Sequence, residues 1–344
     1  MNASWQSHLA AQGASFPDEF SVRFGEDERQ GASLAAQGTV VVPLEHLRVI
    51  RATGEDAGAF LHNLFSNDVK KLGANEAQLN SFNSPKGRML ASMLVWRQGS
   101  DYLLAMSADI HAAMLKKLSM YVLRSKVRLL DDGSDSVLIG LAGSQAGAAL
   151  EAAGLGIPGA PRATASGIAS VVRLDGARFV VSAPISEAAA LWNKFVEARA
   201  VPAGTQAWQW LDIREGLPTV TLPVQEEFVA QMLNFDLIGG VSFNKGCYPG
   251  QEIVARTHYL GKLKKRMYRV HAAIDTQPAV GTDIYAPDFG EQSAGKVVST
   301  APAPEGGYDA LVVLQTSSAE AGQAHLGAPD GPALAFLPLP YTLG

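Results

Sequence analysis

Hydrophobic and polar residues alternate in several short stretches of the first 200 residues, and helical spacing separates these stretches. Residues 47–52 alternate like a strand, Thr53-Gly54 turns the chain, and Asp56 is placed to cap a helix with an apolar side. The same order of strand, turn and helix recurs from Val137 and again from Arg178. This part of the chain therefore predicts strands and helices in one mixed architecture.

Between these units the pattern predicts three strands and a longer helix. The strands are expected at 77–82, 89–96 and 102–106, and the helix at 108–123 because apolar residues recur there with a period of four. Antiparallel strand pairs mixed with helices favour an α+β fold. By contrast, residues 1–38 are polar with little periodicity, and we expect them to form a loosely ordered arm.

After Gly261 the texture of the sequence changes to short alternating runs separated by Gly, Pro and Asp turns. The helical pattern is absent from this part. It predicts a small β-barrel or sandwich, with a domain boundary near 258–264.

Composition narrows the possible classes of protein. The 344 residues carry 28 Lys and Arg against 33 Asp and Glu, a net charge of −5, so nothing draws the whole chain to nucleic acid or anionic membranes. No run approaches the ~20 apolar residues of a membrane span, and we expect a cytoplasmic protein. The seven histidines show no metal-ligand spacing, and one cysteine excludes an intramolecular disulfide or a site of several cysteines.

The only cysteine, Cys247, lies just before a turn signal, Pro249-Gly250, and good helix formers follow from Gln251. We expect the thiol to lie near a helix N-terminus, where free N–H groups and the helix dipole stabilise a thiolate. Lys245 would lower the thiol pKa in the same direction, and so would Arg256. The alternative is that a lone cysteine is a small buried hydrophobe.

A second unusual stretch, 208–218, holds Trp208 and Trp210, followed by Glu215. The two indoles would share a face of a strand but lie on different faces of a helix. They could pack in the core with one tryptophan exposed. Alternatively, they could offer a flat surface to a planar heterocycle, with Glu215 hydrogen-bonding its ring nitrogens.

Two basic stretches could meet anions. Residues 84–88 fit either a cationic turn or a hairpin that faces an anionic ligand or partner. Four cations lie within 262–266, where the ordinary interpretation is a solvated strand start. The alternatives for this run are a polyglutamate tail, an acidic partner and, ranked last because the chain is acidic, nucleic acid.

Residues 245–252, Lys-Gly-Cys-Tyr-Pro-Gly-Gln-Glu, match the signature of the YgfZ family, which the chain resembles from about Val40 to its C-terminus. These are folate-binding proteins of iron–sulfur cluster maintenance, related in fold to the T-protein, the aminomethyltransferase of the glycine cleavage system. Further matching segments are 53–54, 86–87, 125–127, 208–218, 239–243 and 338–341.

The resemblance implies an α+β fold of three domains in a T-protein-like ring around a central hole. The parts expected are an N-terminal arm (1–38), a discontinuous ferredoxin-like folate-binding domain with the cysteine motif (39–52 plus 135–257), an inserted α+β domain (53–134) and a C-terminal β-barrel (258–344).

The same resemblance implies that tetrahydrofolate or a derivative binds in the hole. Trp208 falls on a family tryptophan that contacts folate, and Cys247 falls on the family's functional cysteine. The reactive groups are then Cys247 and Lys245, and the expected folate-binding residues are Trp208, Glu215, Tyr248, Gln251, Glu252 and Arg256.

The sequence departs from these relatives at two places. Leu47 stands where the family has a second folate-site tryptophan. Ala91 and Ser92 stand where the T-protein has its acidic catalytic pair, and neither side chain can act as a carboxylate base. The second departure argues against aminomethyl transfer by the T-protein route.

Three functions follow as hypotheses. The first is a folate-binding accessory protein for iron–sulfur cluster assembly or repair, with an indirect effect on tRNA modification by cluster-dependent radical enzymes. Since one cysteine cannot hold a cluster, any cluster would be shared with a partner protein or a second copy. The alternatives are a folate-dependent one-carbon transferase and a direct tRNA-binding module that uses 262–266.

Overall fold

The structure is a computed structural model that describes residues 1–260 and 263–343. Contacts between residues divide the chain into two compact units, each built from several segments. The first unit comprises Met1–His62, Asp68–Gln78 and Met93–Trp208, and the second comprises Asn63–Asn67, Leu79–Ser92 and Gln209–Gly344.

A six-stranded sheet forms the centre of the first unit. Its order is β10 (Thr164–Ala165), β11 (Ser170–Arg173), β12 (Arg178–Pro184), β9 (Ser136–Ala142), β3 (Val40–Pro43) and β13 (Val201–Pro202). Neighbouring strands are antiparallel except β13, which runs parallel to β3. The strands expected from Val137 and Arg178 are confirmed as β9 and β12.

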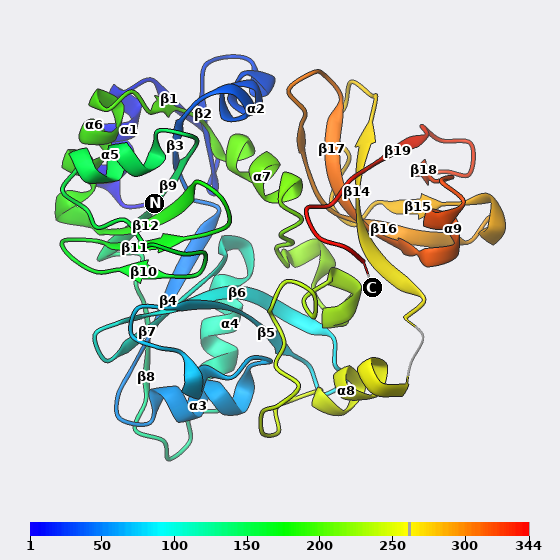
Figure 1. Cartoon of the computed structure of the whole chain (residues 1–344), viewed down its shortest axis with the longest axis horizontal. Coiled ribbons are helices and arrows are strands. Elements are labelled where there is room, and N and C mark those ends of the chain that lie inside the picture. The colour runs from blue at the N-terminus through cyan, green and yellow to red at the C-terminus, as the bar shows by residue number, and fades with distance from the viewer. Residues whose placement is uncertain (261–262, 344) are drawn as a thin grey trace. The chain divides into compact units, whose positions relative to one another are not determined.

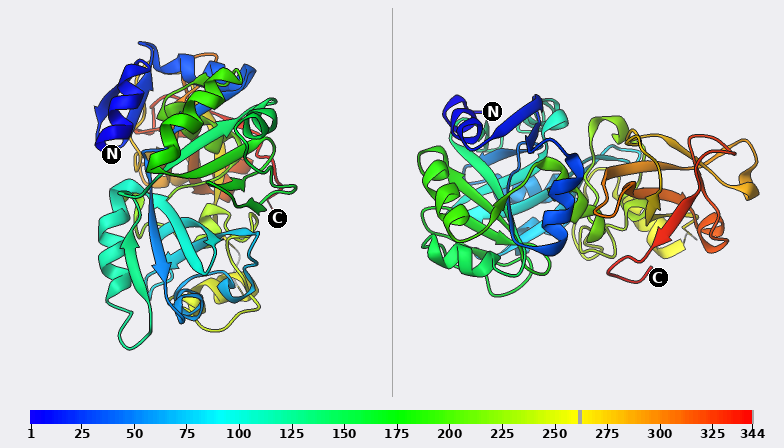
Figure 2. Two further views of the ribbon diagram at one scale, coloured as in Figure 1. Left: turned by 90° about the vertical axis from the view of Figure 1, so that its left-hand side faces the viewer. Right: turned by 90° about the horizontal axis from the view of Figure 1, so that it is seen from above.

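Helices cover one face of this sheet (Figures 1 and 2). They are α1 (Ala3–Ala11), α5 (Ala146–Ala152) and α6 (Ile185–Glu197). Alternate residues of the central strands, such as Ile139 and Val181, point into the core beneath them, as the period of two along a strand requires.

The first 38 residues differ from the loosely ordered arm that we expected. They form α1, a hairpin of β1 (Ala14–Asp18) and β2 (Ser21–Phe24), and α2 (Glu28–Gln37). Trp5 is buried, meets the indole of Trp192 edge-on at 5.7 Å, and donates its Nε1–H to Glu45 at 3.2 Å. These partners lie far away in the sequence, so the local pattern gave no sign of them.

A second, five-stranded sheet has the order β5 (Ala77–Asn83), β6 (Met89–Gln98), β7 (Asp101–Ser107), β4 (Leu47–Thr53) and β8 (Arg128–Asp131). The strands expected at 77–82, 89–96 and 102–106 are confirmed as β5, β6 and β7. The associated helices are α3 (Ala57–Leu64) and α4 (Ala108–Ser119). Helix α4 ends four residues before the expected position, because Met120 and Tyr121 close it with short-range hydrogen bonds to Lys117 and Leu118.

The C-terminal part of the second unit is a curled, six-stranded antiparallel sheet (Figure 1). Its order is β18 (His325–Leu326), β15 (Asp283–Tyr285), β16 (Ser293–Pro302), β17 (Tyr308–Gln315), β14 (Lys265–Ala272) and β19 (Leu334–Leu337). Helix α9 (Thr316–Glu320) and the short helix η4 (Pro287–Phe289) accompany it. The β-barrel or sandwich expected after Gly261 is confirmed as a curled half-barrel, whereas α9 is a helix that the sequence pattern did not predict.

The remaining described elements carry the unusual sequence stretches or connect to them. They are α7 (Thr205–Arg214), α8 (Gln251–Leu260) and the short helices η1 (Val69–Lys71), η2 (Leu222–Val224) and η3 (Ala230–Leu233). The mixed α+β class is confirmed, and the division of residues 39–344 into three domains stays a prediction.

Candidate functional site

Cys247 is exposed and lies four residues before the first residue of α8. The expectation that the thiol lies near a helix N-terminus is therefore confirmed, and it is not a buried packing residue. It opens onto a depression of about 510 Å³. The lining residues are Pro85, Cys247, Tyr248, Pro249, Gly250, Gln251, Glu252 and Ala255.

Two glycines fix the position of this loop. Gly250 has a φ of +76°, and a Cβ there would lie 2.5 Å from the Ser84 carbonyl oxygen and 2.6 Å from the Cα of Gly87. Gly87, at φ +72°, lies against the side chain of Ile253 of α8, whose Cβ would be 2.7 Å from a Cβ at position 87, and against the Gly250 carbonyl oxygen at 3.2 Å. The 84–88 hairpin and the cysteine motif thus pack backbone against backbone, which any side chain at either glycine would prevent.

The ammonium group of Lys245 also holds the loop. It donates to the carbonyl oxygens of Phe65 and Asn67, the latter at 3.1 Å, and lies 4.9 Å from the ring centroid of Tyr248. Lys245 therefore orients the loop through charge-assisted hydrogen bonds to a remote segment. Its expected effect on the pKa of the Cys247 thiol stays a prediction.

The segment 63–67, which belongs to the second unit, is a part of the site that sequence reasoning missed. The Ser66 hydroxyl donates to the Gly240 carbonyl at 2.6 Å, and the Ser242 N–H donates to the Ser66 carbonyl at 3.0 Å. The Asn67 side chain donates to the carbonyl of Gly239 at 2.8 Å. No local sequence pattern signals this contact, because its partners lie more than 170 residues apart in the chain.

Tyr248 is buried next to the exposed thiol. Burial raises the pKa of its hydroxyl well above the usual range, so it stays protonated at neutral pH. Gln251 is half-buried in the first turn of α8, whereas Glu252 and Arg256 are exposed and spaced four residues apart on it. An amide, a carboxylate and a guanidinium therefore follow the thiol along one helix.

Both tryptophans of the 208–218 stretch are buried on α7, so neither is the exposed indole that one interpretation expected. Trp208 is 1% exposed, with the guanidinium of Arg178 4.5 Å from its ring centroid and Gly140 against its six-membered ring. Trp210 donates its Nε1–H to Asp309 at 3.1 Å. Both indoles contribute to internal packing in this structure.

Glu215 follows the last residue of α7 and pairs with Arg214 at 3.1 Å, with 23% of its side chain exposed. Trp208 belongs to the first unit and Glu215 to the second. A folate site that uses both side chains stays a prediction.

The basic run at 262–266 is not a row of solvated cations where the structure describes it. Lys262 lies outside the described residues. Arg266 forms a two-pronged ion pair with Asp236, at 2.7 and 3.0 Å, and is largely buried. Burial lowers the pKa of Lys265, and the neighbouring charge of Lys296 acts in the same direction. Only Lys264 is an exposed cation among the described residues of the run.

Ala91 and Ser92, which stand at the positions of the T-protein's acidic pair, are both buried. Ala91 is fully buried, and the buried Ser92 hydroxyl accepts a hydrogen bond from the Val220 N–H at 2.9 Å. Neither residue supplies a proton-accepting carboxylate, as the sequence had indicated.

Over the described ranges, 1–260 and 263–343, no group of three or more His, Cys, Asp or Glu side chains could hold a metal ion. Within the same ranges, no helix combines the length and the hydrophobicity needed to cross a bilayer.

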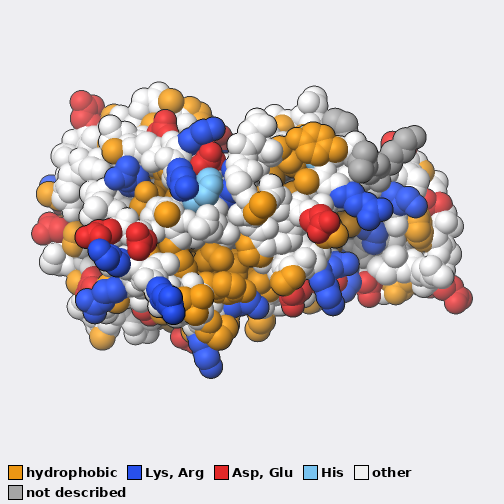
Figure 3. Space-filling model, turned by 90° about the horizontal axis from the view of Figure 1, so that it is seen from below, with side chains coloured by type: hydrophobic (Ala, Val, Ile, Leu, Met, Phe, Trp, Pro, Cys, Tyr) orange, Lys and Arg blue, Asp and Glu red, His pale blue; other side chains and the backbone are white. Residues whose placement is uncertain are grey.

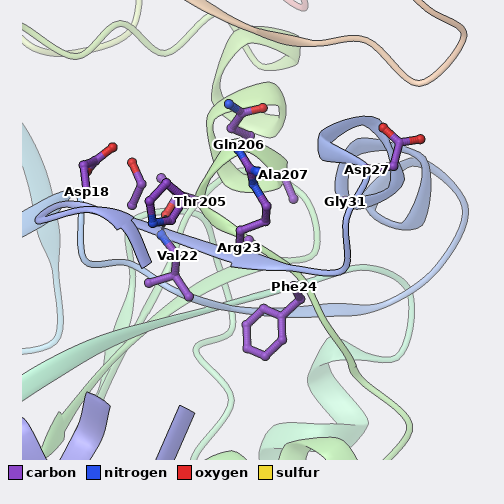
Figure 4. A pocket seen from close by; sticks show the side chains of 12 residues that line it. Asp18, Val22, Arg23, Phe24, Asp27, Gly31, Thr205, Gln206 and Ala207 are labelled. Carbon is purple, nitrogen blue, oxygen red and sulfur yellow. Dashed lines mark hydrogen bonds between the residues drawn. The ribbon is translucent and has the colours of Figure 1, made fainter. Parts of the chain in front are cut away.

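A second cavity lies within the first unit (Figure 4). The β1–β2 hairpin, α2 and the start of α7 surround it, and Arg23 and Gln206 are among its lining residues. Its volume of about 150 Å³ is below the roughly 300–1,000 Å³ of ordinary small-molecule pockets, whereas the depression at Cys247 falls within that range. Of these two spaces, only the one at Cys247 has room for a bicyclic ring.

Comparison with known proteins defines the class first. Residues 11–157 match the family model "GCVT N-terminal domain". The solved structure of the glycine cleavage system aminomethyltransferase T from Bartonella henselae superposes with a TM-score of 0.79, covering 97% of this chain and 96% of that one at 17% identity. The fold is therefore that of the aminomethyltransferase T class.

Two relatives named "tRNA-modifying protein YgfZ" place the chain more narrowly. The protein from Cronobacter sakazakii is 30% identical over 325 residues, which cover 92% of this chain and 97% of the relative. The protein from Sodalis glossinidius is 28% identical over 309 residues, with 88% and 93% covered. The chain belongs to the YgfZ family.

Proposed function

We propose that this protein is a tetrahydrofolate-binding accessory protein that supports the assembly or repair of iron–sulfur clusters in the cytoplasm. Its effect on tRNA is then indirect, through cluster-dependent enzymes that modify tRNA. The observation that carries the proposal is the exposed Cys247 on a loop that is fixed by the Gly87–Gly250 contact and by Lys245, beside an open depression.

The residues around this depression suit a pterin. Gln251 offers an amide donor and acceptor, and Glu252 offers a carboxylate that can accept from ring N–H groups. The buried Tyr248 gives the loop an apolar underside. Folate would supply a one-carbon carrier, and these side chains would orient its ring and exclude water from one side.

The thiol is the reactive group of the proposal. A cysteine near a helix N-terminus, accessible to solvent, can bind an iron atom or react with an oxidised intermediate. Because the chain has one cysteine, the other ligands of any cluster come from a carrier protein or a second copy. The cluster is then a substrate that Cys247 binds transiently, and not a resident cofactor of this protein.

The alternative, folate-dependent one-carbon transfer, needs a carboxylate in place of the T-protein's acidic pair. The carboxylates for it are Glu252, Glu215 and Asp212, while Ala91 and Ser92 supply none. Incubation with tetrahydrofolate and amine donors tests it. Formation of methylene-tetrahydrofolate would replace the accessory role with catalysis.

The decisive experiment compares Cys247→Ala and Cys247→Ser with the wild-type protein in a strain that lacks the endogenous protein. Both variants are expected to fold, because the side chain is exposed, and both should fail to restore cluster-enzyme activity. Full restoration by either would defeat the thiol role.

Ligand binding is tested separately, by titration of reduced folates followed through tryptophan fluorescence. Glu252→Gln should weaken binding, whereas Glu151→Gln, the same change at an exposed position of α5, should not. Trp208→Phe tests the implied tryptophan contact without leaving the large cavity of an alanine. If no reduced folate changes the fluorescence or the thermal stability of the wild-type protein, folate is not its ligand.

A further inference from the structure

Charge is distributed unevenly along this acidic chain. Residues 110–130, here called the basic segment, contain five cations and no Asp or Glu. The other 323 residues hold 23 cations and 33 acids, a net charge of −10. The basic segment therefore carries a charge of opposite sign to the rest of the protein.

The fold places these cations on adjacent elements of the first unit. Helix α4 packs against β4 and β8, and β8 is the edge strand of its sheet. Lys116 lies in the last turn of α4, Arg124 in the connecting loop, and Arg128 at the start of β8, all exposed. Lys117 and Lys126 complete the set.

Large hydrophobic side chains lie among these cations. Met120 is 64% exposed, Tyr121 41% and Leu123 88%. The loop lies at the lower edge of Figure 1, and on the side of the molecule drawn in Figure 3 hydrophobic side chains lie among lysines and arginines. Tyr121, Leu123 and Arg124, with Asp56 and Ser125, line an open depression of about 730 Å³.

Leu123 contributes little to the stability of the fold. Its φ of +45° lies in the left-handed region, which costs a residue with a Cβ roughly 1–2 kcal/mol, and its side chain buries almost nothing. The loop is nevertheless well held, because Ser125 N–H donates to Val122 O at 2.8 Å and Val127 N–H to Ser125 O at 2.9 Å. A strained and exposed leucine on a firm loop indicates a surface kept for contact.

Helix-dipole and ion-pair interactions account for only some of the cations in the basic segment. Lys116 and Lys117 complement the negative end of the α4 dipole, and Lys126 pairs with the exposed Glu55 at 2.8 Å. Neither role involves Arg124 or Arg128, and neither explains the exposed Tyr121.

We propose that the basic segment is a docking surface for RNA, with Lys116, Lys117 and Arg124 on the phosphates and Tyr121 and Leu123 against unpaired bases. Exposed aromatic and apolar side chains between cations suit single-stranded regions, whose bases stack on protein side chains. An acidic protein is the weaker choice, because lysine is depleted in the cores of protein interfaces. The choice of tRNA rests on the proposed function, in which the enzymes that this protein supports act on tRNA; direct docking of that tRNA goes beyond the proposed function.

The experiment measures binding of labelled, unfractionated tRNA to the full-length protein by fluorescence anisotropy, between 25 and 200 mM salt. The triple variant Lys116→Ala/Lys117→Ala/Arg124→Ala should bind at least tenfold more weakly at about 100 mM salt. Its slope of log Kd against log salt should fall by about 2, because each phosphate contact on a single strand contributes about 0.7. Tyr121→Ala should weaken binding severalfold and leave the slope unchanged.

A matched triple variant controls for net charge. Lys70, Lys71 and Lys194 are exposed cations of the same unit outside the basic segment. Their replacement by alanine should change affinity less than twofold. Equal losses in both triple variants, or no tRNA binding by the wild-type protein, would overturn the proposal.

Two further measurements distinguish a failure of the RNA assignment from a failure of the proposed function. Poly-glutamate that displaces tRNA at equal charge concentration would show a surface for acidic polypeptides and refute the RNA assignment. The folate titration repeated on the Lys116/Lys117/Arg124 variant should match the wild type. RNA binding without folate binding would refute the proposed function alone, and folate binding without RNA binding would refute this inference alone.

Discussion

Two loops of this protein present an exposed side chain, and they are built in opposite ways. The loop that carries Cys247 turns on Gly250, whose positive φ and close packing suit only glycine. The loop that carries Leu123 turns on the leucine itself, at φ +45°, although glycine or asparagine would be more stable there. In the first loop the residue with positive φ, Gly250, packs against the fold, and a different residue, Cys247, is exposed. In the second loop Leu123 is both the residue with positive φ and the exposed one.

The largest effect should come from a Cβ at the first turn. Gly250→Ala should lower the free energy of unfolding by about 4 kcal/mol, because it adds left-handed strain to overlap with Ser84 O and Gly87 Cα. Urea unfolding measures the loss. Gly239→Ala is the control, since Gly239 has a similar φ of +75° but open space around its Cβ position, and should cost only about 1–2 kcal/mol. Equal costs would mean that the backbone contact contributes nothing.

Acid should weaken the unit that carries Leu123. Both ring nitrogens of His46 are buried with no hydrogen-bond partner among the described residues, and burial lowers its pKa from 6.5 to about 4. As pH falls through 6.5 the unfolded chain takes up the proton first. Stability should therefore be full above pH ~7.5 and fall by about 3 kcal/mol by pH 4.

Burial lowers the pKa of His111 too, which acts in the same direction. Hydrogen exchange of α4, whose Ala108 N–H donates to the His46 carbonyl, should quicken at pH 5 beyond its intrinsic dependence. His46→Leu should remove most of this pH dependence. An unchanged profile in that variant would assign the effect to other groups.

An intermediate effect is expected at Lys245. Lys245→Met keeps the length of the side chain but removes the hydrogen bonds to Phe65 O and Asn67 O, at a cost of about 2 kcal/mol. Hydrogen exchange over 241–250 should rise, while the loop at 120–126 stays unchanged. Lys264→Met, on an exposed side chain, provides the matched control. No change over 241–250 would show that Lys245 does not hold the loop.

The smallest effect should have the opposite sign. Leu123→Gly removes the left-handed strain but adds freedom to the unfolded chain, so it should raise stability by up to about 1 kcal/mol. Thermal unfolding measures this gain. The same variant should weaken tRNA binding, and a loss of stability would show that Leu123 packs in solution.

Local patterns predicted the strands at 77–82, 89–96 and 102–106 and the position of Cys247 before α8, because alternation and turn signals act over a few residues. The partners of Lys245 escaped prediction because Phe65 lies 180 residues away in the sequence. The order of residues 1–38 was missed for the same reason, since Trp5 is held by Glu45 and Trp192. The sequence also placed Trp208 in a possible ring-stacking site, yet packing against Gly140 and Arg178 buries it.

The segment 63–67 leads to a consequence for biosynthesis. Ser66 bonds to Gly240 and Lys245 bonds to the carbonyls of this segment, although these partners leave the ribosome more than 170 residues later. The first unit has all its residues once position 208 has emerged, whereas the second must wait. During that interval residues 63–67 and 79–92 lack those of their final partners that lie in Gln209–Gly344, so the nascent chain is most vulnerable to chaperone capture or proteolysis there. The thiol can acquire its fixed surroundings only after residues 245–253 have been synthesised.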